Sequence, residues 1–253
     1  MLKTRVIPCL LLRGQGLVKT VKFKDPKYVG DPINAVKIFN DKEVDELIFM
    51  DITATIEKRG PNFKMISEIA AECFMPFGYG GGISHIDEVR RIINVGAEKV
   101  ILNTAAHLNP NLIEEAAAQF GSQSIVVAID IKKSIFGKAE VFIESGQKKV
   151  RISPVDLAKR VEQLGAGEII VNSIDRDGTG EGYDIDLLNK ISSSVHIPIV
   201  ASGGAGKLAD FREAKTRGGA SAVAAGSMFV FHGKHRAVLI TYPEYAELEA
   251  SLN

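Results

Sequence analysis

Two glycine-rich stretches decide the fold: PFGYGGGI at Pro76–Ile83 and PIVASGGAG at Pro198–Gly206. Each begins with a short apolar run and passes through glycines into a stretch with helical periodicity, which is the pattern of a strand, a tight turn and a helix. Gly204 in the second copy lies 123 residues after Gly81 in the first. The chain therefore contains an internal repeat, and each copy carries at least one strand–helix unit.

The same unit recurs along the rest of the chain. Short strand candidates alternate with amphipathic stretches, as expected for strand–helix–strand units around a parallel sheet. The candidates are Arg5–Leu12, Glu46–Ile52, Pro76–Tyr79, Lys99–Asn103, Ser124–Ile131, Glu168–Ile174, Pro198–Ala201 and Ser221–Ala225, and helices are expected to begin near Asp31, Asn62, Ser84, Asn109, Ser153, Asp184, Lys207 and Pro243. Eight units predict an α/β fold, a (βα)8 TIM barrel. We expect one domain over residues 1–253, with similar half-barrels at about 1–123 and 124–253.

Two connections are longer than a barrel needs. Arg13–Gly30 follows the first strand, and Lys132–Ile152 follows the fifth. The second connection includes AEVFIESGQKKVRI, whose alternation around Ser145-Gly146 predicts a β-hairpin outside the barrel. Long loops after barrel strands lie at the carboxyl-terminal face, where they usually take part in binding or catalysis.

Composition narrows the classes of partner. The 253 residues contain 31 Lys and Arg against 31 Asp and Glu, a balance that gives no sign of nucleic acid or of a membrane surface. The apolar start of the chain is broken by Pro8 and is too short to span a bilayer, so we expect a cytosolic protein. Cys9 and Cys73 lack a partner motif, and neither a metal nor a cofactor is expected.

The glycines predict two phosphate sites at equivalent places in the two halves. Glycines that follow a strand and precede a helix let bare backbone N–H groups approach a phosphate. The alternative is that they only form tight turns, but two matched clusters favour a substrate with a phosphate at each end. The predicted residues are Gly81, Gly82, Asn103 and Thr104 in the first half, and Gly203, Gly204, Gly226 and Ser227 in the second.

Four aspartates fall at or just after strand ends, where a barrel carries catalytic residues: Asp51, Asp130, Asp175 and Asp177. Asp130 follows the apolar run Ile125–Ile129, so its carboxyl should be partly desolvated and its pKa raised. That change suits general acid or base catalysis. Asp51 and Asp175 are at least as well explained as loop caps that bind backbone N–H groups. We favour a chemical role for Asp130 and Asp177.

A second set of charges lies at the opposite ends of the strands. Arg5, Glu46, Lys99 and Glu168 each begin a strand candidate and are followed by apolar residues. Two positive and two negative groups around the amino-terminal opening predict a closed ring of ion pairs. The alternative for any one of them is a solvated surface charge.

The chain resembles HisF, the cyclase subunit of imidazole glycerol phosphate synthase, over its full length. The resemblance rests on RVIPCL, GDP, GGGI, GAEKVILNTAA, FGSQSIVVAID, GAGEI, SIDRDGTGEGYD and ASGGAGKL, which occur in the order of that family. It implies that Lys19 and Asp130 match the loop lysine and one of two catalytic aspartates of the family. It also adds Asp177 and Gly178 to the second phosphate site. The charged ring matches the gate through which ammonia from a glutaminase subunit enters the barrel.

One departure from the family concerns catalysis. The family pattern after the first strand has an aspartate where this chain has Leu11. A leucine neither accepts nor donates a proton, and general acid–base catalysis typically contributes a factor of roughly 10² to 10⁴. The sequence therefore predicts severely impaired cyclisation. Tyr79 also replaces a small residue before the glycines, which predicts a rebuilt barrel mouth.

A second departure is the run GGASAVAAGSMFVFHGKHRAVLITYP at Gly218–Pro243. It resembles HisF-like proteins of surface-polysaccharide gene sets. The resemblance implies a heterodimer with a HisH-like glutaminase, and an ATP-dependent amidotransferase that converts an N-acetyl sugar to its acetamidino form. Our leading hypothesis is ammonia conduction for sugar amidation in lipopolysaccharide biosynthesis. The alternatives are the cyclase of histidine biosynthesis and a phosphate-sensing scaffold without catalysis.

Overall fold

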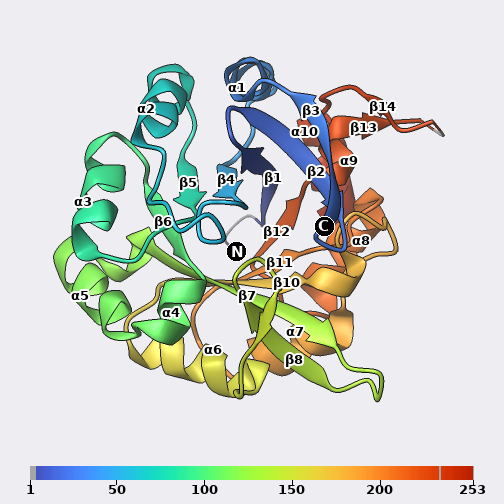
Figure 1. The fold of residues 1–253 in the computed structure, drawn as a ribbon. Helices are drawn as coiled ribbons and strands as arrows, with labels where there is room; N and C mark the ends of the chain where they lie inside the picture. Colours follow the sequence, from blue (N-terminus) through green and yellow to red (C-terminus); the bar gives the residue numbers. More distant parts are fainter. Residues whose placement is uncertain (1–3, 234, 253) are drawn as a thin grey trace.

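The computed structural model describes residues 4–233 and 235–252, and its centre is a closed parallel barrel (Figure 1). The strands follow one another around the barrel in chain order, and β7 pairs with β10 to join the two halves. Pairing of β12 with β1 closes the circle. The barrel strands are β1 (Arg5–Arg13), β4 (Leu47–Asp51), β5 (Phe77–Gly80), β6 (Lys99–Leu102), β7 (Ile125–Lys133), β10 (Glu168–Ser173), β11 (Ile199–Ser202) and β12 (Ala222–Ala225). The predicted (βα)8 fold is confirmed.

Helices surround the barrel, and side-chain caps fix where several of them begin. The side chains of Asp31, Asn62, Ser153 and Asp184 each accept a hydrogen bond from a backbone N–H of the first turn. Pro32 and Pro154 occupy first-turn positions, where their missing N–H costs nothing. The main helices are α1 (Pro32–Asp41), α2 (Phe63–Glu72), α3 (Ile86–Asn94), α5 (Asn111–Phe120), α6 (Pro154–Gln163), α7 (Ile185–Ser192), α8 (Leu208–Thr216) and α10 (Tyr245–Leu252), with short helices α4 (Thr104–Leu108) and α9 (Ser227–Val230) and 3-10 turns η1 (Ser122–Ser124) and η2 (Ile174–Arg176).

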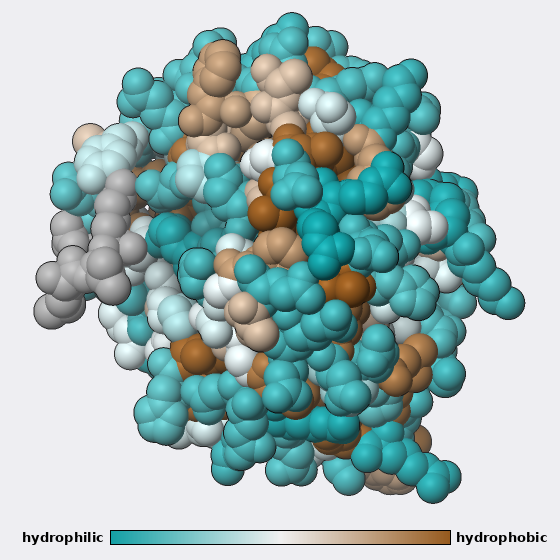
Figure 2. Space-filling model, turned by 90° about the vertical axis from the view of Figure 1, so that its left-hand side faces the viewer, coloured by the Kyte–Doolittle hydropathy of each residue, from teal (hydrophilic) through white to brown (hydrophobic). Residues whose placement is uncertain are grey.

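Apolar side chains fill two separate layers. One lies between strands and helices, and the other fills the barrel interior with Ile7, Ile48, Ile101, Val126, Ile170 and Val200. Tyr79 is fully buried in the outer layer, so the expectation that it rebuilds the mouth is wrong. Hydrophilic residues dominate the face formed by the helical wall (Figure 2). Among the described residues, no helix is both long and apolar enough to cross a bilayer.

Three hairpins project from this frame. The connection after β1 forms β2 (Gly16–Val21) and β3 (Lys24–Gly30), where the sequence indicated only a long loop. The predicted hairpin after the fifth barrel strand is present as β8 (Ala139–Ile143) and β9 (Lys148–Lys149), and β8 also extends β7. Its turn is not wholly outside the barrel, because Ser145 and Gln147 line the mouth. The third hairpin pairs β13 (Phe231–His232) with β14 (Ala237–Val238).

Candidate functional site

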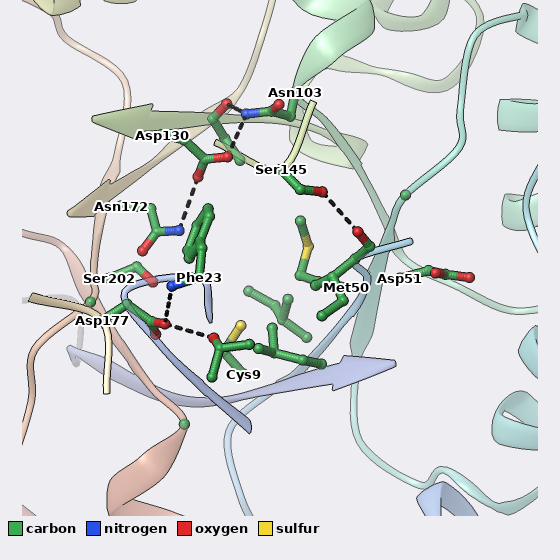
Figure 3. Close-up of a pocket in the computed structure, with 18 of the residues that line it drawn as sticks. Cys9, Phe23, Met50, Asp51, Asn103, Asp130, Ser145, Asn172, Asp177 and Ser202 are labelled. Atoms are coloured by element: carbon green, nitrogen blue, oxygen red, sulfur yellow. Dashed lines mark hydrogen bonds between the residues drawn. The ribbon is translucent and has the colours of Figure 1, made fainter. Parts of the chain in front are cut away.

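A cavity of about 360 Å³ opens at the carboxyl ends of the barrel strands (Figure 3). Its walls come from both halves of the chain and from the turns of two hairpins. Barrel interior residues such as Ile48, Ile101 and Ile170 form its floor. Its volume falls within the range usual for small-molecule sites.

Asp130 is the inward-facing residue near the carboxyl end of β7. Its two carboxylate oxygens accept hydrogen bonds from Asn103 Nδ2 at 3.2 Å and Asn172 Nδ2 at 2.9 Å. Burial raises the pKa of Asp130 to about 6, and the nearby Asp177 carboxylate adds to this effect, while the bonds from Asn172 and Asn103 oppose it. A carboxylate that titrates at this pH can exchange a proton near neutrality.

Leu11 lines the same cavity from β1. The isobutyl group adds an apolar surface at the position where the resemblance implies a second catalytic aspartate, so the mouth has one of the two carboxylates expected. Leu11 therefore changes the cavity wall directly, whereas Tyr79 is buried in the outer layer.

Lys19 reaches into the mouth from β2. Only 5% of its surface is exposed, and Nζ donates to the carbonyl oxygen of Cys9 at 2.6 Å. Burial lowers the pKa of Lys19. A Cβ built at Gly226 would lie 1.7 Å from Nζ, so the ammonium occupies space that only a glycine leaves free. The lysine therefore lies against the second glycine cluster.

Asp177 ties the β2–β3 hairpin to the rim. Its Oδ2 accepts from the Thr20 hydroxyl at 2.7 Å and more weakly from the backbone N–H of Phe23 at 3.4 Å. The backbone N–H of Lys22 donates to the Asp177 carbonyl oxygen at 2.9 Å. These contacts hold Phe23 over the cavity, where its ring packs against Gly146 of the β8–β9 turn (Figure 3).

The first predicted phosphate site lies around the turns after β5 and β6. Gly81 and Gly82 have φ angles of +119° and +73°, and a Cβ at Gly81 would lie 2.4 Å from the carbonyl oxygen of Asp51. Asn103 also donates to the carbonyl oxygen of Ala128 at 2.9 Å. The Thr104 hydroxyl accepts from the backbone N–H of Glu144 at 3.0 Å. All four predicted residues line the cavity.

The second predicted site lies across the mouth and has equally close backbone packing. A Cβ at Gly203 would lie 2.5 Å from the Ser173 carbonyl oxygen, and one at Gly204 would lie 2.2 Å from that of Gly182. Gly178, Gly226 and Ser227 complete the set on the cavity wall. The tight-turn explanation is therefore valid for both clusters, and it does not compete with an anion site because the same bare backbones face the cavity.

The two remaining aspartates have structural partners. Asp51 forms a bidentate ion pair with Arg59, with N–O distances of 2.8 and 2.9 Å. Its carboxylate also accepts hydrogen bonds from the backbone N–H groups of Thr53 and Ala54. Asp175 accepts from the backbone N–H of Lys133 at 2.6 Å. Their contacts match the loop-capping alternative.

The four charged residues at the other end of the barrel form a closed ring. Arg5 pairs with both Glu46 and Glu168, and Lys99 Nζ lies 2.9 and 2.8 Å from the same two carboxylates. Burial alone would lower the pKa of Arg5, but the two glutamates outweigh it and raise that pKa. Both glutamates are buried, so each depends on its two cationic neighbours.

Sequence reasoning missed several residues of the mouth. Asn172 follows the inward-facing Ile170 by two positions on β10, so strict alternation could have placed it in the cavity. Phe23 and Thr20 carried no such signal, because their position depends on a hairpin that the sequence did not reveal. Among residues 4–233 and 235–252, no cluster of three or more metal-ligating side chains occurs.

Comparison with known proteins gives consistent matches over almost the whole chain. Residues 5–236 match the family model described as "Histidine biosynthesis protein". The chain is 54% identical over 249 residues to the Pseudomonas aeruginosa protein named "Putative imidazole glycerol phosphate synthase subunit hisF2", covering 98% of this chain and 99% of that one. It is 44% identical over 232 residues to imidazole glycerol phosphate synthase subunit HisF of Alkaliphilus metalliredigens, covering 92% of each chain.

Proposed function

Because the chain belongs to the HisF family of histidine biosynthesis proteins, we propose that it is the barrel subunit of a two-subunit synthase. In this proposal a HisH-like glutaminase docks at the amino-terminal end of the barrel and releases ammonia there. The barrel subunit passes the ammonia along its interior to a phosphorylated acceptor in the mouth.

The observation that carries this proposal is the order of features along the barrel axis. The ring of Arg5, Glu46, Lys99 and Glu168 is at one end, and the cavity with Asp130 is at the other. Mainly apolar side chains such as Ile7 and Val126 lie between them. An uncharged small molecule crosses an apolar interior at much lower cost than an ion does. This order suits delivery of ammonia from the amino-terminal end of the barrel to a site in the mouth.

The first candidate acceptor is the ribulosyl aminoimidazole nucleotide that a cyclase of histidine biosynthesis would use. The names of the two relatives favour this candidate. Two glycine-lined sites on opposite sides of the mouth suit a substrate with a phosphate at each end. Asp130 would transfer a proton during ring closure, and Lys19 would place a positive charge beside the second phosphate.

The second candidate is an N-acetyl sugar that receives its nitrogen through a separate ATP-dependent amidotransferase in surface-polysaccharide biosynthesis. Leu11 favours this candidate, because conduction of ammonia needs no second carboxylate. The barrel would then bind a phosphorylated molecule without cyclising it.

Steady-state assays with the glutaminase from the same genome separate the two candidates. Turnover of the ribulosyl aminoimidazole nucleotide at a rate comparable with an ordinary cyclase identifies a cyclase. A rate about two orders of magnitude or more below that of an ordinary cyclase favours the amidation role, provided that the rate is this low with either ammonium salt or glutamine as the nitrogen source. The shared proposal fails if the glutaminase neither binds the protein nor gains activity in its presence.

A further inference from the structure

The β13–β14 hairpin places an arginine at the rim of the second glycine-lined site. Arg236 Nη1 donates to the carbonyl oxygen of Gly178 at 3.2 Å, and Gly178 lines the mouth cavity. The guanidinium also lies 4.6 Å from the centre of the Phe231 ring. In Figure 1 this hairpin lies on the side of the barrel where β2 and β3 also lie.

These two contacts hold the guanidinium but leave most of its hydrogen-bonding capacity unused. An arginine has five N–H donors, and stacking on an aromatic face leaves the edges of the group open. Within the described part of the chain, no carboxylate forms an ion pair with Arg236. Among these residues, therefore, no paired carboxylate competes with a phosphate for the open edges of the Arg236 guanidinium.

The surrounding sequence brings no carboxylate to this hairpin. Residues 214–243 contain no aspartate or glutamate, while His232, His235 and Arg236 lie close together in the hairpin. Arg236 itself has a φ of +49°, a conformation that side-chain-bearing residues seldom adopt. On the inner side of the same site, the Lys19 ammonium lies against Gly226. Two cations therefore flank the second glycine cluster, one from each of two hairpins.

We propose that Arg236 is a phosphate-binding residue of the second site and selects acceptors that carry a phosphate at that end. The planar guanidinium fork matches two oxygens of a phosphate, while the glycine N–H groups bind the others. This inference rests on the proposed function, because it takes the second glycine cluster to be a phosphate site. It adds a specificity-determining residue that the glycines and Lys19 do not supply.

The test is a titration of the full chain, labelled with ¹⁵N-glycine, with inorganic phosphate at constant ionic strength. The amides of Gly178, Gly203, Gly204 and Gly226 report on the second site, and those of Gly81 and Gly82 report on the first within the same sample. In Arg236→Gln the side-chain carboxamide of the glutamine can still donate a hydrogen bond to the Gly178 carbonyl oxygen, but the positive charge is lost. We expect the phosphate dissociation constant at the second set to rise roughly tenfold, and that at the first set to stay unchanged.

Two further variants make the result specific. Arg236→Lys should weaken the second site less than Arg236→Gln does, because it keeps the charge and loses the fork. Arg217→Ala removes an exposed arginine from the end of α8 and should change neither set, although it lowers the net charge equally.

Three results would overturn the inference. Unchanged affinity at the second set in Arg236→Gln removes the role of Arg236 and leaves the phosphate site intact. Equal loss at both sets indicates a general effect of charge or folding. If the second set does not respond to phosphate in the unaltered protein, the second phosphate site of the proposed function fails together with the inference.

Discussion

Asp130 retains its proton to a higher pH than an exposed aspartate because its carboxylate is buried. The pKa rises from 3.8 to about 6 on folding. Both folded and unfolded chains hold this proton below pH 3.8, so the group then has no effect on stability. As the pH rises from 3.8 toward 6, the unfolded chain ionises first and the free energy of unfolding falls. This destabilisation reaches its full value when both states are ionised, and it persists at higher pH.

Asp130→Asn removes this titration and should therefore become more stable relative to the unaltered protein as the pH rises from 4 to 6. The pKa difference corresponds to a gain of at most about 3 kcal/mol above pH 6. Urea unfolding between pH 4 and 8 measures it, and Asp186→Asn on the exposed side of α7 serves as the control. If the unfolding free energies of Asp130→Asn and the unaltered protein differ by the same amount at every pH, the pKa of Asp130 is not raised.

Leu11→Asp restores a carboxyl group to the wall of the mouth opposite the Asp130 side. We expect ammonia-dependent cyclisation of the ribulosyl aminoimidazole nucleotide to increase at least tenfold, which is a fraction of the usual effect of an acid–base group. Leu11→Asn has a similar shape and polarity but transfers no proton. Equal rates in the two variants would show that the polarity of residue 11, and not its proton, limits the reaction.

At the scale of elements, the mouth depends on how β2 is held against the turn after β10. A Cβ at Gly178 would lie 2.3 Å from the Thr20 carbonyl oxygen, and Gly178 has a φ of +71°. Gly178→Ala should therefore push the end of β2 away and expose the β2–β3 hairpin. Limited proteolysis should cut residues 16–30 several times faster in this variant.

Gly14→Ala is the matched control for this effect. Gly14 has a φ of +60° and no atom within 4 Å of a built Cβ, so it tests backbone strain without a clash. If both variants are cleaved equally fast, the strain of the left-handed backbone explains the change, and contact between β2 and the turn does not.

Elements with a local signature were predictable from the sequence. Helix starts followed from Asp31 and Ser153, since an N-cap before a proline is a local pattern. The β2–β3 hairpin was not predictable, because its turn uses Lys22 and Phe23 at positive φ instead of Gly or Asn. Tyr79 shows a related limit: the alternation along β5 was visible, but packing against other elements decided which face became the interior.

The candidate site was predicted unevenly for the same reason. Positions at strand ends were found because a barrel gathers the ends of all its parallel strands at one face. The contacts of Asp177 with Thr20 and Phe23 join segments more than 150 residues apart, and no local pattern reports such a pairing. The coupling of hairpins over the mouth therefore required the structure.

At the scale of the whole molecule, the charged ring should affect the use of ammonia from a docked glutaminase more than it affects the reaction at the mouth. Lys99→Ala leaves the buried Glu46 and Glu168 with Arg5 as their remaining ring partner, and breaking a buried pair costs about 3 to 5 kcal/mol. We expect glutamine-dependent product formation to fall well below the ammonium-dependent rate in the reconstituted complex.

Lys64→Ala on α2 is the control, because the Lys64 side chain is 87% exposed. It should leave both rates unchanged. If Lys99→Ala lowers the glutamine-dependent and ammonium-dependent rates equally, the ring maintains the fold and does not control the passage of ammonia.

Strand β1 connects the two ends of the barrel, with Arg5 in the ring and Leu11 at the mouth. Six residues of extended chain separate them by roughly 20 Å, and mutations more than about 7 to 10 Å apart usually act independently. Under the proposed function, one copy of a duplicated gene can therefore lose acid–base chemistry at residue 11 while the ring at Arg5 still receives ammonia from a glutaminase. In that proposal, a subunit that conducts ammonia without cyclising a substrate can arise by a substitution at one end of β1.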